Sequence, residues 1–573
     1  MSADQNNPQA QYMLGVIYEE GKYIARDINK AIFYYKLAAD QNISQAQCNL
    51  AIIYYDGKYI MRDMNKVIHY FSLAADNNFN QALYNLGFIY YNGEYVTQDI
   101  QKAIHYFSLA AKQNDSDAQF FLGIIYVSYD IEKAIHYLTL SANQNNSDSQ
   151  FYLGIIYCGG KYVTRNIEKS IYYFKLAAKQ NVAIAQYNLG VTYYDGKYVT
   201  RDIDKSVHYF TLAANQNYPQ AQFFLGLFYY EGGYVARDIN KSIHYLSLAA
   251  NQNVEEAQFN LGIIYQQAHD FNKAIYYLTL AANQNHPKAQ FSMGFIYYQG
   301  KYVKQDINKA VHYFSLSAEK NYSNAQFCLG LIYFFGLHFP KDEIKGKRYI
   351  IQSSMNGFRK ANFMHGFLLH EGRHIKRDIK EAIHYYKEAS SFNIEFAKNN
   401  LGIIYKHGFE EENIHKRIGN AIEYFKEAIR QKNDHLSMYN LAHLYIYEDS
   451  IEHDINKSIE LLIKSSNQFN HSLLLLCIAL IKQFGNDISA IKQKVAKSGL
   501  ESKVCNIILS YKLYENFDSL YESYRTIDFL YNIGLKPILT SHLQNIKLEN
   551  KISPNAKDIT SLFYEGFGLD LYD

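Results

Sequence analysis

Leu189-Gly190-Val191-Thr192-Tyr193-Tyr194-Asp195-Gly196 belongs to a pattern that returns, mostly every 36 residues, along more than four-fifths of this 573-residue chain. The glycine of its Leu-Gly step falls at Gly15, Gly87, Gly123, Gly154, Gly190, Gly226, Gly262, Gly294, Gly330 and Gly402, with weaker copies at Ala51, Gly366 and Ala442. A fixed period of this length is typical of stacked units, each of which buries its apolar face only against its neighbours. The sequence therefore predicts an all-α solenoid of about 13 repeats.

Each repeat reads as two helices. Ala185, Leu189 and Tyr193 recur at helical spacing and predict a first helix, helix A, which Gly196 should end. Asp202 then offers its carboxylate to the free amides of a second helix, helix B. The apolar positions of helix B are Ile203, Val207, Phe210 and Ala214.

The end of helix B is marked by one recurring residue. Asparagine follows the alanine pair at Asn42, Asn78, Asn114, Asn181, Asn217, Asn253 and Asn321. In the next copy Gly357 takes this place. Because asparagine and glycine readily adopt positive φ, the exchange predicts a left-handed residue at this point.

The repeat resembles the Sel-one-like repeat (SLR) family, a branch of the tetratricopeptide-like α/α repeat proteins. The matching residues in this copy are Ala185, Leu189, Gly190, Tyr193, Gly196, Val199, Asp202, Lys205, Ala213 and Ala214. Two positions depart from the family pattern, because the second loop glycine and the helix B tryptophan are usually tyrosine here, as at Tyr198 and Tyr209. The resemblance implies a right-handed α/α superhelix that serves as a non-enzymatic scaffold or adaptor for protein complexes.

Composition narrows the class of protein. A net charge of +2 gives no electrostatic case for nucleic acid. Five scattered cysteines predict no disulfide framework, and neither a signal peptide nor a transmembrane stretch is recognisable. We therefore expect a cytoplasmic or otherwise intracellular protein without membrane insertion, cofactor or metal, and of unknown oligomeric state.

Helix A carries the candidate partner-binding residues. An aromatic residue recurs after a glutamine, and asparagine often follows it. Since an asparagine amide both donates and accepts, it can pair with a peptide backbone along a concave helix A surface. The alternatives are that the aromatic residues pack between repeats and that the asparagine is family consensus. The candidates are Asn49, Asn85, Asn188, Asn260, Asn400, Asn440, Phe120, Phe223, Phe259 and Phe291.

Two histidine patterns suggest metal. Seven histidines recur on helix B, but packed repeats lie too far apart for their rings to share one zinc ion, so we expect a solvated stripe. They are His69, His105, His136, His208, His244, His312 and His384. The stretch His370-Glu371-Gly372-Arg373-His374 spells a zinc-protease signature, yet Gly372 aligns with the helix-ending Gly196, so both histidines should not share a helix face. We expect a chance match.

The loops and the end of the chain complete the prediction. Loop arginines such as Arg201 could follow phosphates, but each usually precedes an aspartate, which predicts local neutralisation rather than a nucleic-acid stripe. After about residue 470 the repeat fades. We therefore expect a solenoid over residues 1–470 and a degenerate repeat with a helical cap over residues 471–573. The alternative function is an enzyme or a partner-specific effector activity in residues 471–573.

Overall fold

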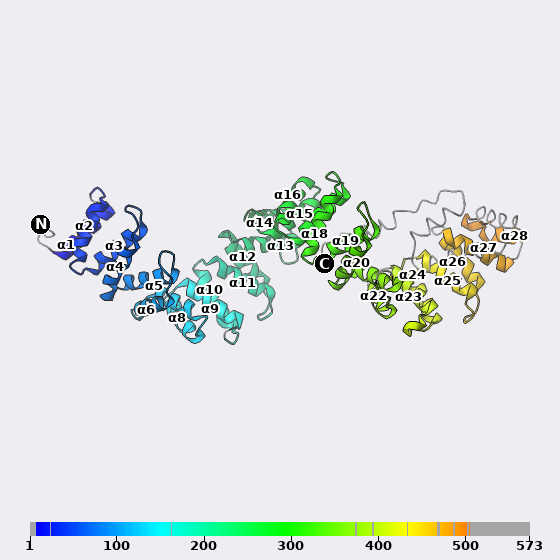
Figure 1. Ribbon diagram of the computed structural model, residues 1–573, viewed down its shortest axis with the longest axis horizontal. Helices are drawn as coiled ribbons and strands as arrows, with labels where there is room; N and C mark the ends of the chain where they lie inside the picture. Colours follow the sequence, from blue (N-terminus) through cyan, green and yellow to red (C-terminus); the bar gives the residue numbers. More distant parts are fainter. Residues whose placement is uncertain are drawn as a thin grey trace. The chain divides into compact units, whose positions relative to one another are not determined.

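The computed structural model describes residues 7–500 and residue 504, except for residues 23, 162, 373–374, 392–394, 433, 467–469 and 485–486. These residues form antiparallel pairs of α-helices and confirm the all-α solenoid (Figure 1). The chain divides into two compact units, residues 1–261 and 262–573, and the same helical hairpin recurs in each. Most of the predicted segment 471–573 lies outside the described residues, so that boundary stays a prediction.

Odd-numbered helices from α1 to α25 are helices A. Their bounds are α1 Pro8–Glu20, α3 Ser44–Asp56, α5 Asn80–Asn92, α7 Ser116–Tyr126, α9 Ser147–Gly159, α11 Ala183–Asp195, α13 Pro219–Glu231, α15 Glu255–Gln267, α17 Pro287–Gln299, α19 Ser323–Phe335, α21 Arg359–Glu371, α23 Glu395–His407 and α25 His435–Tyr447.

Even-numbered helices from α2 to α26 are helices B. Their bounds are α2 Ile28–Ala39, α4 Met64–Asp76, α6 Ile100–Lys112, α8 Ile131–Asn143, α10 Ile167–Lys179, α12 Ile203–Asn215, α14 Ile239–Asn251, α16 Phe271–Asn283, α18 Ile307–Glu319, α20 Glu343–Met355, α22 Ile379–Ser391, α24 Ile418–Lys432 and α26 Ile455–Ser466. A 3-10 turn, Glu410–Glu412, precedes α24.

The predicted helix ends are confirmed. Gly196 follows α11 with φ 63°, and the Asp202 carboxylate accepts the Lys205 amide at the start of α12. The seven asparagines after helix B all have φ between 55° and 67°, and Gly357 has φ 82°. These are the left-handed positions that asparagine and glycine tolerate best.

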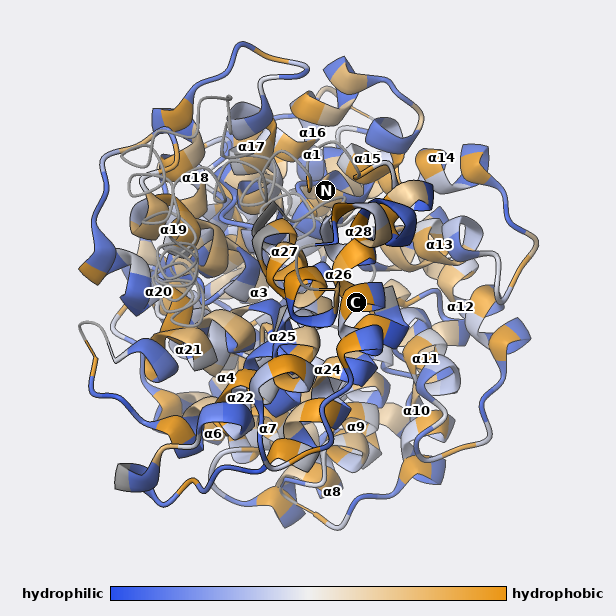
Figure 2. Cartoon of the chain, turned by 90° about the vertical axis from the view of Figure 1, so that its right-hand side faces the viewer, coloured by the Kyte–Doolittle hydropathy of each residue, from blue (hydrophilic) through white to orange (hydrophobic). Residues whose placement is uncertain are grey.

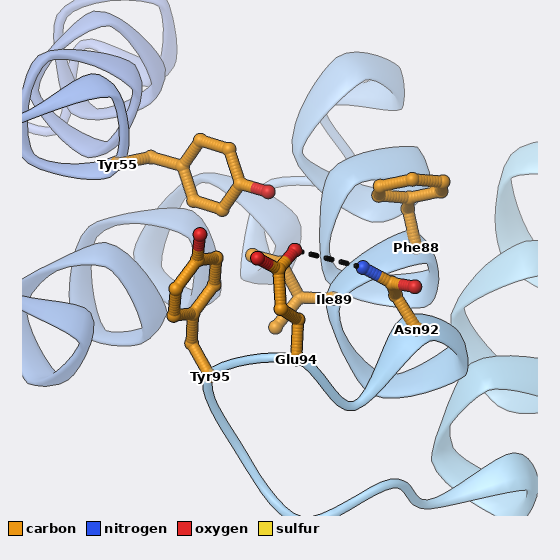
Figure 3. Close-up of a pocket in the computed structure, with 6 residues that line it drawn as sticks. All are labelled: Tyr55, Phe88, Ile89, Asn92, Glu94 and Tyr95. Atoms are coloured by element: carbon orange, nitrogen blue, oxygen red, sulfur yellow. Dashed lines mark hydrogen bonds between the residues drawn. The ribbon is translucent and has the colours of Figure 1, made fainter.

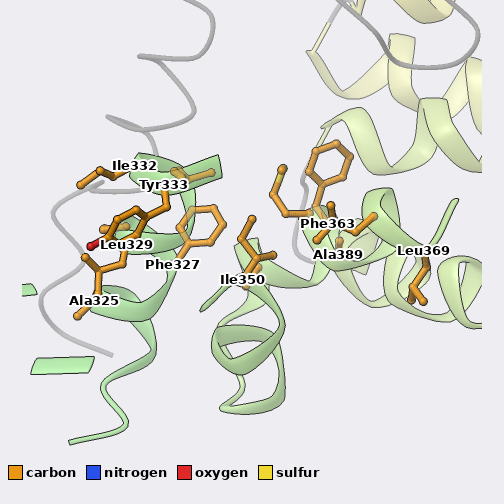
Figure 4. Close-up of a cluster of buried hydrophobic side chains, with 14 of the residues drawn as sticks. Ala325, Phe327, Leu329, Ile332, Tyr333, Ile350, Phe363, Leu369 and Ala389 are labelled. Atoms are coloured by element: carbon orange, nitrogen blue, oxygen red, sulfur yellow. The ribbon is translucent and has the colours of Figure 1, made fainter. Parts of the chain in front are cut away.

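Apolar residues are buried between the two helices of each repeat and between neighbouring repeats. Hydrophobic and hydrophilic residues alternate along the helices (Figure 2). In the C-terminal unit, helices α19 to α22 bury one continuous cluster that includes Phe327, Leu329, Ile350 and Leu369 (Figure 4). Each repeat thus completes its core only by packing against the next one.

Helix α27 (Asn470–Phe484) follows the last repeat and is largely hydrophobic (Figure 2). It packs on α26 and buries Leu475, Leu476 and Ile478 with residues of α28 (Ile488–Val495). A second 3-10 turn, Ala496–Ser498, follows α28. The described part of the C-terminal segment is therefore helical and covers the end of the last repeat, as expected for a cap.

A ladder of buried glutamines joins successive repeats. Gln186 of α11 donates through Nε2 to the carbonyl of Ala178 in the preceding repeat at 3.1 Å, and its Oε1 accepts Nε2 of Gln216 at 2.7 Å. The same two bonds recur at Gln150 and Gln222. Because Gln186 is 1% exposed, its hydrogen bonds satisfy polar groups that water cannot reach.

Replacing Gln186 by leucine should lower the local free energy of unfolding by about 1–3 kcal/mol, since the Gln216 side chain would lose its partner and the Ala178 carbonyl would keep only backbone partners such as the Asn181 amide. Hydrogen exchange of the α10 and α11 amides would measure the loss. Gln220→Leu is the matched control, because Gln220 lies exposed on helix α13. Equal protection of the two variants would contradict the role of the ladder.

Candidate functional site: the helix A face

Neighbouring helices A contact each other within each unit. In the N-terminal unit α7 contacts both α5 and α9, and in the C-terminal unit α23 contacts α25. Along each helix A, residues four and then three positions apart lie on one side. In α11 these are Ile184, Asn188 and Val191, which are exposed or half-buried. We call the corresponding side of α1, α3, α5, α7, α9, α11 and α13 the A face of the N-terminal unit.

Three candidate asparagines, on α5, α11 and α15, keep part of their side chain at the surface. Asn188 donates to the Ile184 carbonyl of its own helix at 2.9 Å, and Asn260 donates to the Glu256 carbonyl at 2.7 Å. Asn85 is half-buried. Bonds to the preceding turn of the same helix compete with the backbone and add little stability. These hydrogen bonds of Asn188 and Asn260 therefore stay within their own helices.

Three other candidate asparagines have partners in the adjacent helix. Asn49 and Asn400 each donate to a tyrosine hydroxyl at 3.1 Å, those of Tyr35 and Tyr386. Most other repeats have phenylalanine or leucine at the position of these two tyrosines. The tyrosine hydroxyls are buried, and the two asparagines give them a hydrogen-bond partner. Asn440 is 1% exposed and donates to Asn399 at 2.9 Å.

The candidate aromatic residues differ in burial. Phe259 and Phe291 are buried, and Phe291 packs 5.7 Å from Phe314 and 5.3 Å from Tyr322. Phe120 and Phe223 are half-buried. Phe120 lies 5.7 Å from Tyr152, a residue of the next helix A. The rings thus contribute to packing between repeats, and the half-buried ones also border the A face.

The seven helix B histidines are all exposed. Each of them packs edge-on or tilted against the tyrosine that follows it, as His208 does against Tyr209 at 5.3 Å. This arrangement is the solvated stripe that the sequence predicts. In the described part of the chain, no group of three or more histidine, cysteine or acidic side chains is arranged to hold a metal ion.

The protease-like signature is interrupted where the sequence predicts. Helix α21 ends at Glu371, and Gly372 follows with φ 69°. The ring of His370 packs 5.5 Å from Phe409 and 6.2 Å from Tyr386. Burial and, to a smaller extent, the Arg377 guanidinium lower the pKa of His370 to about 4. His374 lies outside the described residues.

The loop arginines contact other partners than the aspartates that the sequence predicts. The Arg201 guanidinium lies 4.9 Å from the ring centre of Tyr234, in the next loop, and Arg62 lies 4.4 Å from that of Tyr95. The aspartate after each arginine instead pairs with a lysine three residues later, as Asp202 does with Lys205 at 2.6 Å. The recurring loop tyrosine thus gives each arginine a cation–π partner.

Two hollows in the described surface differ in size, and neither is suited to catalysis. One near the start of the chain, bordered by Tyr55, Phe88, Asn92 and Tyr95, has a volume of about 10 Å³, which is room for one water molecule (Figure 3). Asn92 donates to Glu94 across it at 3.3 Å. A wider hollow of about 310 Å³ is lined by α20 and by Ile375. Its lining side chains, which include Ile344, Lys347 and Arg348, contain no carboxylate for acid–base chemistry.

Comparison with known families supports this geometry. The model of the Sel1 repeat matches thirteen consecutive segments between residues 8 and 468. The chain belongs to the Sel1 repeat family. The matched segments are residues 8–43, 44–79, 80–115, 116–146, 147–182, 183–218, 219–254, 255–286, 287–322, 323–358, 359–391, 396–433 and 435–468.

Solved Sel1 repeat structures are similar to this chain. The crystal structure of c5321, a protective antigen present in uropathogenic Escherichia coli strains that displays an SLR fold, is 25% identical with a TM-score of 0.61, covering 81% of this chain and 97% of that one. A Sel1 repeat protein from Oxalobacter formigenes is also 25% identical, with a TM-score of 0.43, covering 56% of this chain and 93% of that one. No curated protein matches the chain. None of the described helices is both long and apolar enough to cross a membrane.

Proposed function

We propose that this Sel1 repeat protein is a non-enzymatic interaction scaffold, which presents the helix A side of its repeats to a partner protein or peptide. The coarser part of the proposal has family support, because Sel1 repeat proteins are generally protein–protein interaction scaffolds. The observation that carries the proposal is that helices A contact one another while Asn85, Asn188 and Asn260 keep amides at their surface. A row of amides at regular spacing suits an extended backbone, which offers donors and acceptors whatever its sequence.

The test replaces Asn85, Asn188 and Asn260 together by alanine. Each lost hydrogen bond should weaken partner binding by about 0.5–1.5 kcal/mol, so the triple variant should bind roughly tenfold to a thousandfold more weakly. Helicity and melting temperature should not fall, because alanine is the better helix former and these amides support no core packing. Quantitative capture of interacting proteins from the native cell gives the binding readout.

The matched control is the triple alanine variant of His69, His208 and His244, three exposed side chains on helices B of the same unit. We expect it to capture the same proteins in the same amounts as the unmodified chain. If the histidine variant loses partners and the asparagine variant keeps them, the partner binds on helices B and the proposal is wrong.

A further inference from the structure

Charge is divided between the two kinds of helix in the N-terminal unit. The seven helices A from α1 to α13 and the start of α15 contain nine acidic residues and no lysine or arginine. The acidic residues are Glu19, Glu20, Asp56, Asp117, Asp148, Asp195, Glu231, Glu255 and Glu256. Helices B of the same unit contain eleven lysines, from Lys30 to Lys241. In the C-terminal unit helices A do contain lysine and arginine, for example Lys288 and Arg359.

The fold does not require this division. Helix propensity is similar for lysine, arginine, glutamine and glutamate, so exposed positions beyond the first turn of a helix A would accept a cation at little structural cost. Only in the first turn, where Asp117 and Asp148 lie, does the helix dipole itself favour an acidic residue. The lysines of helices B have a local explanation, because many of them pair with the aspartate at the start of their own helix, as Lys66 does with Asp63 at 3.0 Å. The absence of cations from eight successive helices A therefore calls for an explanation outside the fold.

Negative charge and exposed apolar side chains meet on α7, α9 and α11. Asp148, Tyr152 and Ile155 are spaced to lie on one side of α9, and Asp117 and Phe121 take the same two positions on α7. Tyr152 is 39% exposed, and Ile155 is 42% exposed. On α11, Ile184 occupies the position that Asp148 has on α9, and it is 37% exposed.

Asp117 lies beside the start of α9, because the amide of Asn146, two residues before Asp148, contacts it. The pKa of Asp117 is raised mainly by partial burial and by the Asp115 carboxylate, and to a smaller extent by Asp148, while the Asn146 hydrogen bond opposes the rise. The Asn146 amide donates to Asp117 at 3.0 Å but brings no positive charge. Like charges held together beside exposed apolar groups cost stability unless something neutralises them. A cation from another chain would do so.

We propose that the A face of the N-terminal unit binds a partner segment that carries arginine between apolar residues, with the arginine over Tyr152 and paired with Asp117 and Asp148. The planar guanidinium stacks on an aromatic ring and donates in pairs to carboxylates, which the compact ammonium group of lysine does less well. Phe121, Ile155 and Ile184 surround this position with apolar surface for the flanking side chains. The inference rests on the proposed scaffold function and adds the chemistry of the partner.

The experiment uses the full chain and short fluorescent peptides that alternate leucine with arginine, with the neutral isostere citrulline, or with glutamate. We expect the arginine peptide to bind and the other two to bind at least tenfold more weakly. Asp117→Asn with Asp148→Asn should weaken the arginine peptide about tenfold, and Tyr152→Ala should weaken it as well. The matched control is Glu168→Gln with Asp204→Asn, which removes the same charge from exposed positions on helices B.

The control variant should bind the arginine peptide within twofold of the unmodified chain. If both double variants bind the arginine peptide equally weakly, only the net charge of the chain matters. If the citrulline peptide binds as well as the arginine peptide, the charge of the peptide does not matter. Either result overturns the inference. Full capture of the native partner by the Asp117/Asp148 variant, together with loss in the asparagine variant, would overturn this inference alone. Unchanged capture by both would overturn the proposed function as well.

Discussion

Replacing Gly190 by valine is expected to lower the free energy of unfolding of its repeat by about 3 kcal/mol. Gly190 of α11 lies directly against the ring of Phe210 in α12. A Cβ atom at this position would lie 2.6 Å from Cδ1 of Phe210, well inside van der Waals contact. Phe210 is fully buried and packs against Phe224 at 5.0 Å, so its ring has no free space into which to move. The two helices must therefore separate, and hydrogen exchange of their amides would measure the loss.

The control for Gly190 is Gly233→Val, because a Cβ atom at Gly233 would meet nothing within 4 Å. Phe210→Ala alone should cost about 3–5 kcal/mol, but combined with Gly190→Val it should cost less than the sum, since valine would fill part of the space that the ring vacates. Additive losses would show that the Gly190–Phe210 contact does not cause the effect. Alanine at Gly190 should cost less than valine, because Ala51 already faces the buried Phe71 in the second repeat.

The period of the sequence was enough to predict the helices, their ends and the family, because each of those features depends on residues close together in the chain. Gly196 ends α11 and Asp202 caps α12 through local geometry that every repeat shares. The expectation of a cap over residues 471–573 rests on a different reason, which is that a stack of repeats must cover its final apolar face, and it stays a prediction.

The partners of individual side chains were harder to predict because they depend on what the neighbouring repeat supplies. Asn49 and Asn188 occupy the same repeat position, but only Asn49 faces a tyrosine hydroxyl, since Tyr35 replaces the usual phenylalanine. The sequence contained that signal, yet it is meaningful only once the two helices are known to face each other.

The loop and ladder contacts were missed for the same reason. Arg201 precedes Asp202 in the chain, which suggested that the two charges neutralise each other. In the structure the arginine instead lies over Tyr234 of the next loop. The glutamine that precedes each helix A aromatic residue was visible as a repeated step, but its role in joining repeats requires the buried carbonyl of Ala178 to be placed beside Gln186.

Acid should destabilise the C-terminal unit before it affects the N-terminal one. Two histidines of α21 lose contact with water in the fold: His365 is 6% exposed and packs against Tyr385, and His370 is half-buried and packs against Phe409. Burial lowers the pKa of both from 6.5 to about 4, and the Arg377 guanidinium adds to the effect at His370. Below pH 6.5 the unfolded chain therefore binds protons that the folded chain does not, and stability falls as the pH falls toward 4.

The loss should reach at most about 3 kcal/mol for each imidazole, and melting of the chain between pH 7 and pH 4.5 would measure it. His365→Leu with His370→Phe should reduce this dependence while keeping the core filled, since leucine and aromatic residues occupy the equivalent places Leu329 and Phe334 in the preceding repeat. A smaller dependence should remain, because burial also lowers the pKa of His443 in α25. The control is His384→Gln, which changes an exposed histidine of helix B. The aspartates that cap helices B do not account for the effect, because the pKa of a cap such as Asp202 is lowered below 3.8 and its stabilisation is lost only at more acidic pH. A pH dependence as large in the double variant as in the unmodified chain would show that other groups carry it.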